Sequence, residues 1–230
     1  MKTSNIIFVS LLGAIAVIIL ALLANISISG HRTGNFEVNM STSKQPLTSF
    51  KVLSMDNCNR VQLIKNDSAF VEIIYRKDSL PPILNLTGKK DTFFLKDLRL
   101  LNNRNISLKI YTPDVLEKVV LKNSILGIEN YNFRKLIFDL DHSQVSGDQN
   151  LKVKSVVDAV SIIAKNHAEI DLSELKADSI KFFLQKSKAY LSIKTNKISG
   201  CLADSSSAYI RQASEMVLKK DSSSEINVGN

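Results

Sequence analysis

The sequence of 230 residues contains no Trp, three His, two Cys, four Pro and eight Gly. So few Gly and Pro exclude a collagen-like chain and a disordered chain rich in Pro and Gly. Two cysteines, Cys58 and Cys201, are too few for a disulfide framework or a four-thiolate zinc site. The His residues are scattered, and no phosphate-binding loop or Gly-x-Ser-x-Gly motif occurs. The composition therefore predicts a globular protein without a catalytic, cofactor-binding or metal site.

Positive charge is in excess, with 30 Lys and Arg against 22 Asp and Glu and a net charge of +8. This excess favours contact with anionic surfaces such as phospholipid or acidic polysaccharide. Most of the basic residues are single Lys residues spread along the chain. Because Arg does not cluster with aromatic residues and no recognition-helix motif occurs, no nucleic-acid partner is expected.

One long apolar run, residues 6–24, carries no charge. At about 1.5 Å per helical residue this run nearly spans a hydrocarbon core of about 30 Å, so it predicts a transmembrane signal anchor behind a cytoplasmic tail of residues 1–5. A cleaved signal peptide is the alternative because Lys2 supplies a positive N-terminal region, but Leu22 is not the small residue expected at position −3 before Asn25. The sequence thus predicts a single-pass protein of the cell membrane with an extracytoplasmic C-terminal domain, periplasmic in a Gram-negative cell.

An exported domain lies in a compartment that permits disulfides. The sequence leaves open whether Cys58 and Cys201 pair or remain two free buried thiols.

Residues 25–48 are polar and lack periodicity, which predicts a tether. Apolar and polar residues then alternate at 52–55, 61–64 and 70–75, followed by further strand candidates up to Pro113. Residues 49–113 are therefore predicted to form a short antiparallel β section that caps the remaining chain.

The remaining chain, residues 114–230, is repetitive. An apolar residue followed by a polar corner recurs six times, at LKNS 121–124, LDHS 140–143, AKNH 164–167, LQKS 184–187, LADS 202–205 and LKKD 218–221. Steps of about 19 residues are typical of one coil of a β-solenoid, or β-helix, so an all-β fold with about six coils is predicted. An antiparallel sandwich is the alternative, but it usually contains Asn-Gly or Asp-Gly hairpins, and none occurs here.

The repeat corners contain the chain's only candidate chemistry. Asp139, Asp141, His142 and Ser143 include the residue types of a catalytic triad, but triad residues converge from separate elements, and these are nearly contiguous. His142 and His167 could approach each other at successive corners, yet two imidazoles without a third ligand make a poor metal site.

Two serine runs, Ser205–Ser207 and Ser222–Ser224, also fall at corners. Their hydroxyl groups are expected to bond the local backbone, with hydrogen bonding to a glycan as the alternative. No catalytic, cofactor or metal residue is therefore assigned, and the chain is predicted not to be an enzyme.

The order of these features resembles a known envelope family, the GIN-type "putative auto-transporter adhesin head" domain of Bacteroidetes. The resemblance covers about residues 50–228 and follows an N-terminal anchor, an opening strand pair, a bridge of the type Leu-x-Ile-Tyr-x-Pro and Ser-centred repeats. Its residues are Phe50, Val52, Val61, Leu63, Ile64, Leu108, Ile110, Tyr111 and Pro113. The resemblance implies a β-helical fold and an envelope location. The chain departs from the family in its corners, which contain almost no Gly.

The predicted function is a membrane-anchored, extracytoplasmic, adhesin-like scaffold or interaction module without catalytic activity. Its expected partners are the membrane, through residues 6–24, and an envelope protein or an anionic glycan. A self-assembling structural β-helix protein of the envelope is the first alternative. A carbohydrate-active β-helix enzyme is the second, and it would need carboxylates that converge on one groove.

Overall fold

A computed structural model of the protein describes residues 39–78, 84, 86–98, 106–113, 116–129, 133–147, 156–172 and 175–229. Ser41–Asn230 form one compact unit. The predicted cytoplasmic tail, the predicted transmembrane helix over 6–24 and residues 25–38 of the predicted tether lie outside the described residues. Among the residues that the structure describes, no helix has the length and apolar character needed to cross a membrane, so a transmembrane helix is not part of the described fold.

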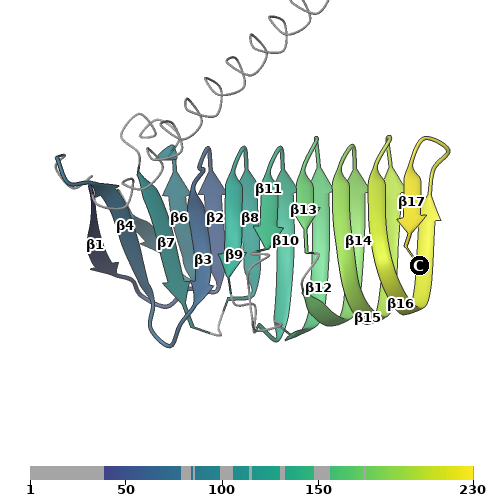
Figure 1. The fold of residues 1–230 in the computed structure, drawn as a ribbon, viewed down its shortest axis with the longest axis horizontal. Coiled ribbons are helices and arrows are strands. Elements are labelled where there is room, and N and C mark those ends of the chain that lie inside the picture. Colours follow the sequence, from purple (N-terminus) through teal and green to yellow (C-terminus); the bar gives the residue numbers. More distant parts are fainter. Residues whose placement is uncertain are drawn as a thin grey trace, which may run out of the picture. The chain divides into compact units, whose positions relative to one another are not determined.

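Every regular element of the described residues is a β-strand, as the all-β prediction required, and the 17 strands belong to one sheet (Figure 1). In chain order they are β1 (Met40–Pro46), β2 (Val52–Asp56), β3 (Val61–Lys65), β4 (Phe70–Arg76), β5 (Thr87–Lys89), β6 (Thr92–Lys96), β7 (Ser107–Thr112), β8 (Lys118–Lys122), β9 (Ile125–Glu129), β10 (Lys135–Asp141), β11 (Gln144–Gly147), β12 (Val156–Lys165), β13 (Glu169–Asp171), β14 (Lys176–Gln185), β15 (Lys188–Ala203), β16 (Ser207–Lys220) and β17 (Glu225–Val228).

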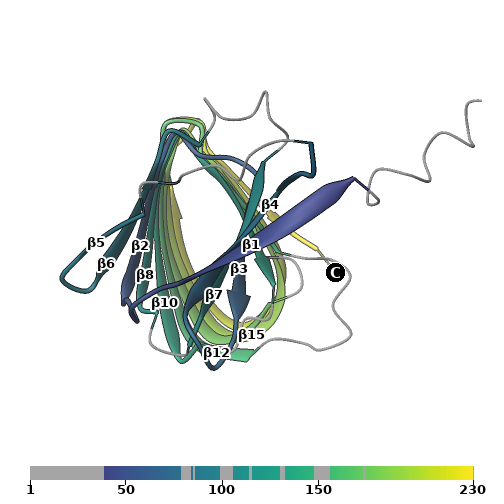
Figure 2. The ribbon, with the colours of Figure 1, turned by 90° about the vertical axis from the view of Figure 1, so that its left-hand side faces the viewer.

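Most strands lie in two rows of parallel neighbours. The first row runs through β6, β2, β8, β10, β12, β14 and the C-terminal parts of β15 and β16. The second row runs through β7, β3, β9, β11, β13, the N-terminal parts of β15 and β16, and β17. Short polar corners join β2 to β3, β8 to β9 and the later pairs. Figure 2 shows the sheet bent at these corners, so that the two rows face each other across the core.

Alternation along each first-row strand determines which residues enter the core. Successive residues of a strand point to opposite faces, so every second residue can be apolar and buried. Leu121, Leu140, Ala164, Leu184 and Leu202 are all buried and are partners in one continuous register. Five of the six predicted repeat positions are thereby confirmed.

The core is closely filled where the alternation is weakest. Gly200 is the register partner of Phe182, and a Cβ atom on Gly200 would overlap the Phe182 ring. The ring is buried, so the missing side chain at residue 200 leaves the space that the aromatic ring needs.

The predicted β-solenoid of about six coils is wrong, because the strands form a single mixed sheet and no closed solenoid. The chain does not proceed along the sheet step by step, since β2 lies between β6 and β8 and β3 lies between β7 and β9. Antiparallel pairing of β4 with β7 and of β5 with β6 also interrupts the parallel order. Local alternation and recurring corners are common to solenoid coils and to strands of a bent parallel sheet, so the pattern alone does not separate them.

The predicted antiparallel β section over 49–113 is wrong for its first two strands. β2 and β3 pair in parallel with β8 and β9, so they belong to the same two rows as the repeats. The sequence contains a signal for this, because Met55 and Asp56, the register partners of Leu121 and Lys122, are followed by Asn57 and Cys58, much as Leu121 and Lys122 are followed by Asn123 and Ser124. Antiparallel pairing in this section joins β4 to β7 and β5 to β6.

The last predicted repeat position is also displaced. The register partner of Leu202 is Lys220, and Leu218 pairs instead with Gly200. An apolar residue does not occupy the inward position before the final corner. The Lys220 ammonium group instead donates to the carbonyl oxygen of Ser224 at 3.0 Å.

Candidate functional site

The corners turn without glycine. Six of them contain a non-Gly residue with φ between 47° and 55°, namely Asn57, Asn123, His142, Asn166, Lys186 and Asp204. Asn and Asp adopt this left-handed backbone conformation more readily than other residues with a side chain. Four of the six are Asn or Asp, which explains how the chain forms these corners although it departs from the Gly-containing corners of the family that it resembles.

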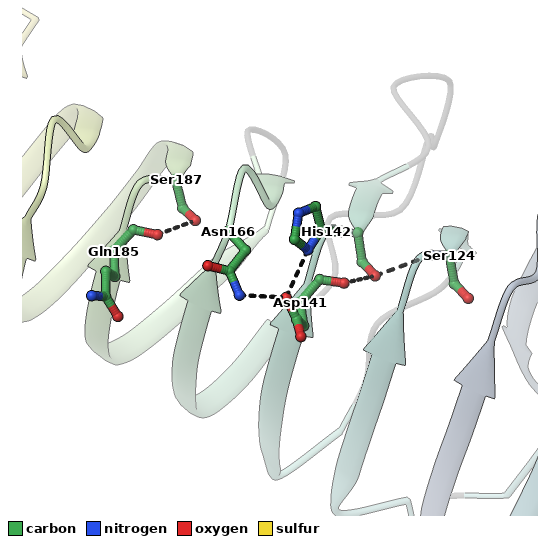
Figure 3. Close-up of polar contacts among 7 residues, drawn as sticks. Ser124, Asp141, His142, Asn166, Gln185 and Ser187 are labelled. Atoms are coloured by element: carbon green, nitrogen blue, oxygen red, sulfur yellow. Dashed lines mark hydrogen bonds and ion pairs between the residues drawn. The ribbon is translucent and has the colours of Figure 1, made fainter.

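A column of buried hydroxyl groups connects successive corners. Ser124 Oγ accepts the backbone N–H of Cys58 at 3.0 Å and donates to the carbonyl oxygen of Lys122 at 2.7 Å. Ser143 Oγ in turn accepts the N–H of Ser124 at 3.0 Å and donates to the carbonyl oxygen of Asp141 at 2.7 Å (Figure 3). Each hydroxyl therefore satisfies a buried backbone donor of the preceding step, which would otherwise lose a hydrogen bond.

The same column continues in the C-terminal half. Ser206 Oγ accepts the N–H of Ser187, and Ser224 Oγ accepts the N–H of Ser206, both at 3.2 Å. Ala168 interrupts the column, because it is buried at the corner that follows Ser143 and has no hydroxyl. In each of the two serine runs, the buried member bonds the corner backbone, as the first of the two sequence interpretations expected.

The triad residue types meet at one corner but not in a catalytic arrangement. Asp141 Oδ1 lies 2.9 Å from Nδ1 of His142 and accepts a hydrogen bond from Asn166 Nδ2 at 2.8 Å (Figure 3). These two contacts, with Asn166 the stronger, lower the pKa of Asp141. Ser143 faces the other way, buried and bonded to the backbone, so its hydroxyl group is not presented to a substrate.

The remaining corner candidates are also engaged by neighbours. The rings of His142 and His167 approach to a centroid distance of 6.2 Å, as stacking of corners predicted. Within the described ranges, however, no three His, Cys, Asp or Glu side chains are grouped so as to hold a metal ion. Asp139 pairs with Nζ of Lys118 at 2.9 Å on the outer face of the first row.

A second polar cluster links the last three corners. Gln185 Nε2 donates to Asp204 Oδ2 at 2.8 Å, and the backbone N–H of Asp204 donates to Asp221 Oδ2 at 2.7 Å. Hydrogen bonds from the Ser224 hydroxyl, the Asp204 backbone and Ser223 lower the pKa of Asp221 to about 2. These polar groups therefore bond one another from step to step and hold the corners in line.

The structure also settles the state of the two cysteines, which are both free thiols. Cys58 is buried in the position that Ser occupies at the later corners, and its Sγ donates to the carbonyl oxygens of Asp56 and Leu95. Burial raises the pKa of the Cys58 thiol. Cys201 lies half-buried on the first row, as the partner of Phe183.

A partly exposed aromatic pair on the second row was not found from the sequence. Tyr190 and Tyr209 are register partners on β15 and β16, and their rings stack at a centroid distance of 4.9 Å with 8° between planes. Tyr209 is 39% exposed. A signal was present, because Lys188-Ala189-Tyr190-Leu191 and Ser207-Ala208-Tyr209-Ile210 share an outward Tyr between inward apolar residues.

Charged and polar groups surround this Tyr pair. Tyr190 has Asp171 as its register partner on β13, and Tyr209 has Asn227 as its partner on β17. Lys188 and Arg211, the residues two positions before Tyr190 and two after Tyr209, are exposed. The outer face of the second row thus combines two aromatic rings with groups of both charges.

No protein-family model matches the chain, and no curated protein sequence matches it. Among solved structures, the fold is similar to a "putative adhesin" from Bacteroides fragilis, with 12% identity, 82% of this chain and 96% of that chain covered, and a TM-score of 0.57. It is also similar to a "putative adhesin" from Parabacteroides distasonis, with 12% identity, 83% and 93% coverage, and a TM-score of 0.51. At such low identity the likeness concerns the fold alone. The chain therefore shares the fold of adhesin-like structures from Bacteroidetes, while membership of the GIN-type family stays a prediction.

Proposed function

We propose that the protein is a non-catalytic, adhesin-like interaction module that binds an anionic glycan on the outer face of its second row. The observation that carries this proposal is the stack of half-buried Tyr190 on exposed Tyr209. Tyrosine is enriched at binding hot spots because its ring offers apolar area while its hydroxyl group offers hydrogen bonds. A sugar ring presents the same combination of C–H and hydroxyl groups.

The charges around the Tyr pair are mixed, because Glu169, Asp171 and Glu225 share its face with two basic residues, so the preference for an anionic ligand rests on the net charge of the whole chain. Lys188 and Arg211 lie beside the two rings and are exposed, and the whole chain carries a net charge of +8. Exposed basic groups attract an acidic polymer over a distance of about 10 Å at 0.1 M salt. The aromatic stack then supplies a contact that salt does not screen.

Engagement of the carboxylates supports a non-catalytic role. Asp139 is paired with Lys118, and Asp141 is held by His142 and Asn166 on the same strand end. A glycosidase needs two carboxylates that flank one bond, with one of them able to carry a proton near neutral pH. The pKa of Asp141 is lowered, so Asp141 is not suited to be the carboxyl group that carries a proton near neutral pH. The extracytoplasmic location expected from residues 6–24 stays a prediction of the sequence.

The test is surface plasmon resonance of the immobilised full chain against neutral and sulfated or carboxylated soluble polysaccharides. Phe183→Ala is the matched control for Tyr209→Ala, because Phe183 is an aromatic residue of nearly equal exposure, 38%, on the first row. We expect Tyr209→Ala to weaken binding of the anionic polysaccharide by about tenfold, as at a hot spot. We expect Phe183→Ala to change it by less than about twofold.

Two results would overturn the proposal. The first is equal weakening by both variants, or binding that disappears completely at about 0.5 M salt, where the screening length falls to a few Å, because dispersed lysines alone would then account for it. The second is turnover of a polysaccharide that Asp139→Asn or Asp141→Asn abolishes, which would indicate an enzyme.

A further inference from the structure

The last strand of the first row has an open backbone edge. Residues 212–220 of β16 pair with β15 on one side. β17 pairs only with residues 207–210 of the same strand, and no other described strand pairs with the remaining residues. An edge strand of this kind presents unpaired N–H and C=O groups to another chain.

Exposed apolar side chains are concentrated on the last two strands of the sheet, and two of them, Met216 and Val217, lie in the unpaired segment. Four of the six large hydrophobic residues that are exposed in the described ranges lie on β16 and β17, and they are Tyr209, Met216, Val217 and Val228. Met216 is 41% exposed although it is the register partner of the fully buried Ile198. The apolar interior therefore continues up to the edge and is not covered there by a described strand.

Register assigns the faces of the edge segment. Met216 and Leu218 are partners of Ile198 and Gly200, whose neighbours in the row face the core. Successive residues of a strand point to opposite faces, so Glu215, Val217 and Lys219 lie on the outer face. Glu215 pairs there with Nζ of Lys197 at 3.0 Å.

The sequence of the segment is complementary to itself when read backwards. In antiparallel pairing centred on Val217, Glu215 of each copy lies opposite Lys219 of the other, and Met216 lies opposite Leu218. Directly opposite residues of an antiparallel pair have Cβ atoms about 4.5–5.5 Å apart and contribute when their charges are opposite or both side chains are apolar. Both ion pairs fall on the outer face, and both apolar pairs continue the core.

We propose that two copies of this chain associate by antiparallel pairing of residues 214–220 of β16 about a two-fold axis at Val217. The pairing extends the first row of one copy into the first row of the other and covers Met216 on both. A two-fold interface uses the same patch on both copies and closes after two. The product is a dimer and not the filament that stacking of both ends would produce.

A disulfide across the axis tests the register. The full chain is purified in mild detergent with Cys201→Ser, and Val217→Cys is compared with Ser199→Cys, which lies at the same register position one strand further in. Residues opposite each other on the axis have Cα atoms about 4.5–5.5 Å apart, which a disulfide can bridge. The two residues 199 would be separated by three strand spacings, about 14 Å. We expect a covalent dimer from Val217→Cys and none from Ser199→Cys.

Charge reversal tests the complementarity by sedimentation equilibrium of the same full chain. Glu215→Lys and Lys219→Glu each place two like-charged pairs in the interface, and we expect each to weaken the dimer by about tenfold. The double variant restores opposite charges, and we expect it to return to within about threefold of the original dissociation constant. The Lys197–Glu215 pair is exposed, so its loss has little effect on folding.

Three outcomes would overturn the proposal. A monomer at every concentration would show that two copies do not associate. Equal crosslinking at residues 199 and 217 would place the interface elsewhere, as would equal weakening by the double and single variants. If another segment of the same chain covers the edge, the protein would be a monomer at every concentration.

Discussion

The two ends of the sheet contrast in how their edge strands are made. At the N-terminal end the outer strands are β5, with only three residues, and β1, which pairs with β4 and is polar between Met40 and Pro46. β1 also carries Lys44 and Pro46, two residue types that discourage further pairing at an edge. At the C-terminal end β16 presents Met216 and Val217 instead. The sheet thus has a short or polar edge at its N-terminal end and an edge with exposed apolar side chains at its C-terminal end.

The core is covered by a further strand at the N-terminal end of the sheet and is left partly uncovered at the C-terminal end. At the N-terminal end, antiparallel β4 lies beside β7 and completes the core with Val71 and Ile73, both fully buried. Phe70 stacks on Tyr111 at 4.2 Å, and Lys44 lies over the Phe70 ring. At the C-terminal end the inward positions of β16 hold Met216 and Lys220, which are exposed. A change of strand direction therefore accompanies closure, whereas continued parallel pairing leaves the last core layer open.

The largest expected effect compares apolar truncation at the two ends. Ile73→Ala should lower the free energy of unfolding by about 2–5 kcal/mol, because it leaves a cavity in a covered core. Met216→Ala should cost less than about 1 kcal/mol in the monomer, because its side chain is already partly in water. Urea unfolding of the dilute full chain measures both. Equal costs would show that the C-terminal end is covered as well.

A smaller effect tests whether the contrast extends to the corners. Ser124→Ala near the N-terminal end and Ser206→Ala near the C-terminal end should each cost about 1–3 kcal/mol, because each leaves a buried N–H, of Cys58 or of Ser187, without its acceptor. Exposed Ser222→Ala should stay within about 0.5 kcal/mol of the parent chain. Similar costs at both ends would confine the difference to the strand edges. A far smaller cost for Ser206→Ala would contradict that view.

The smallest effect concerns acid stability at the last corner. The pKa of Asp221 is lowered to about 2 in the folded chain, below its ordinary 3.8, so ionised Asp221 favours folding above pH 4. This contribution should decrease as the pH falls from 4 through 2. We expect the difference in unfolding midpoint between the parent chain and Asp221→Asn to be present at pH 6 and largely lost at pH 2. The Ser222→Ala difference, which involves no titrating group, should not change, and a pH-independent Asp221→Asn difference would contradict the assignment.

Local pattern was sufficient to predict five of the six repeat residues that were expected at the inward position before a corner. Leu140 and Leu184 are buried and His142 and Lys186 are exposed, as alternation before each corner requires. The hydroxyl groups of the corner serines were likewise expected to bond the local backbone, and Ser206 Oγ donates to the carbonyl oxygen of Ala203. These features depend on residues a few positions apart, so the chain's own order of apolar and polar side chains specifies them.

Pairing between distant segments was not specified in that local way. β2 lies between β6 and β8 because of hydrogen bonds and side-chain packing between segments tens of residues apart, and the likeness of the β2 corner to the β8 corner can be interpreted only once this pairing is known. The strand β1 within the expected tether, the stack of Tyr190 on Tyr209 and the open edge of β16 are products of the same pairing. Alternation states which side of a strand is apolar, but the neighbour that covers it is selected by the free energy of the whole packed sheet.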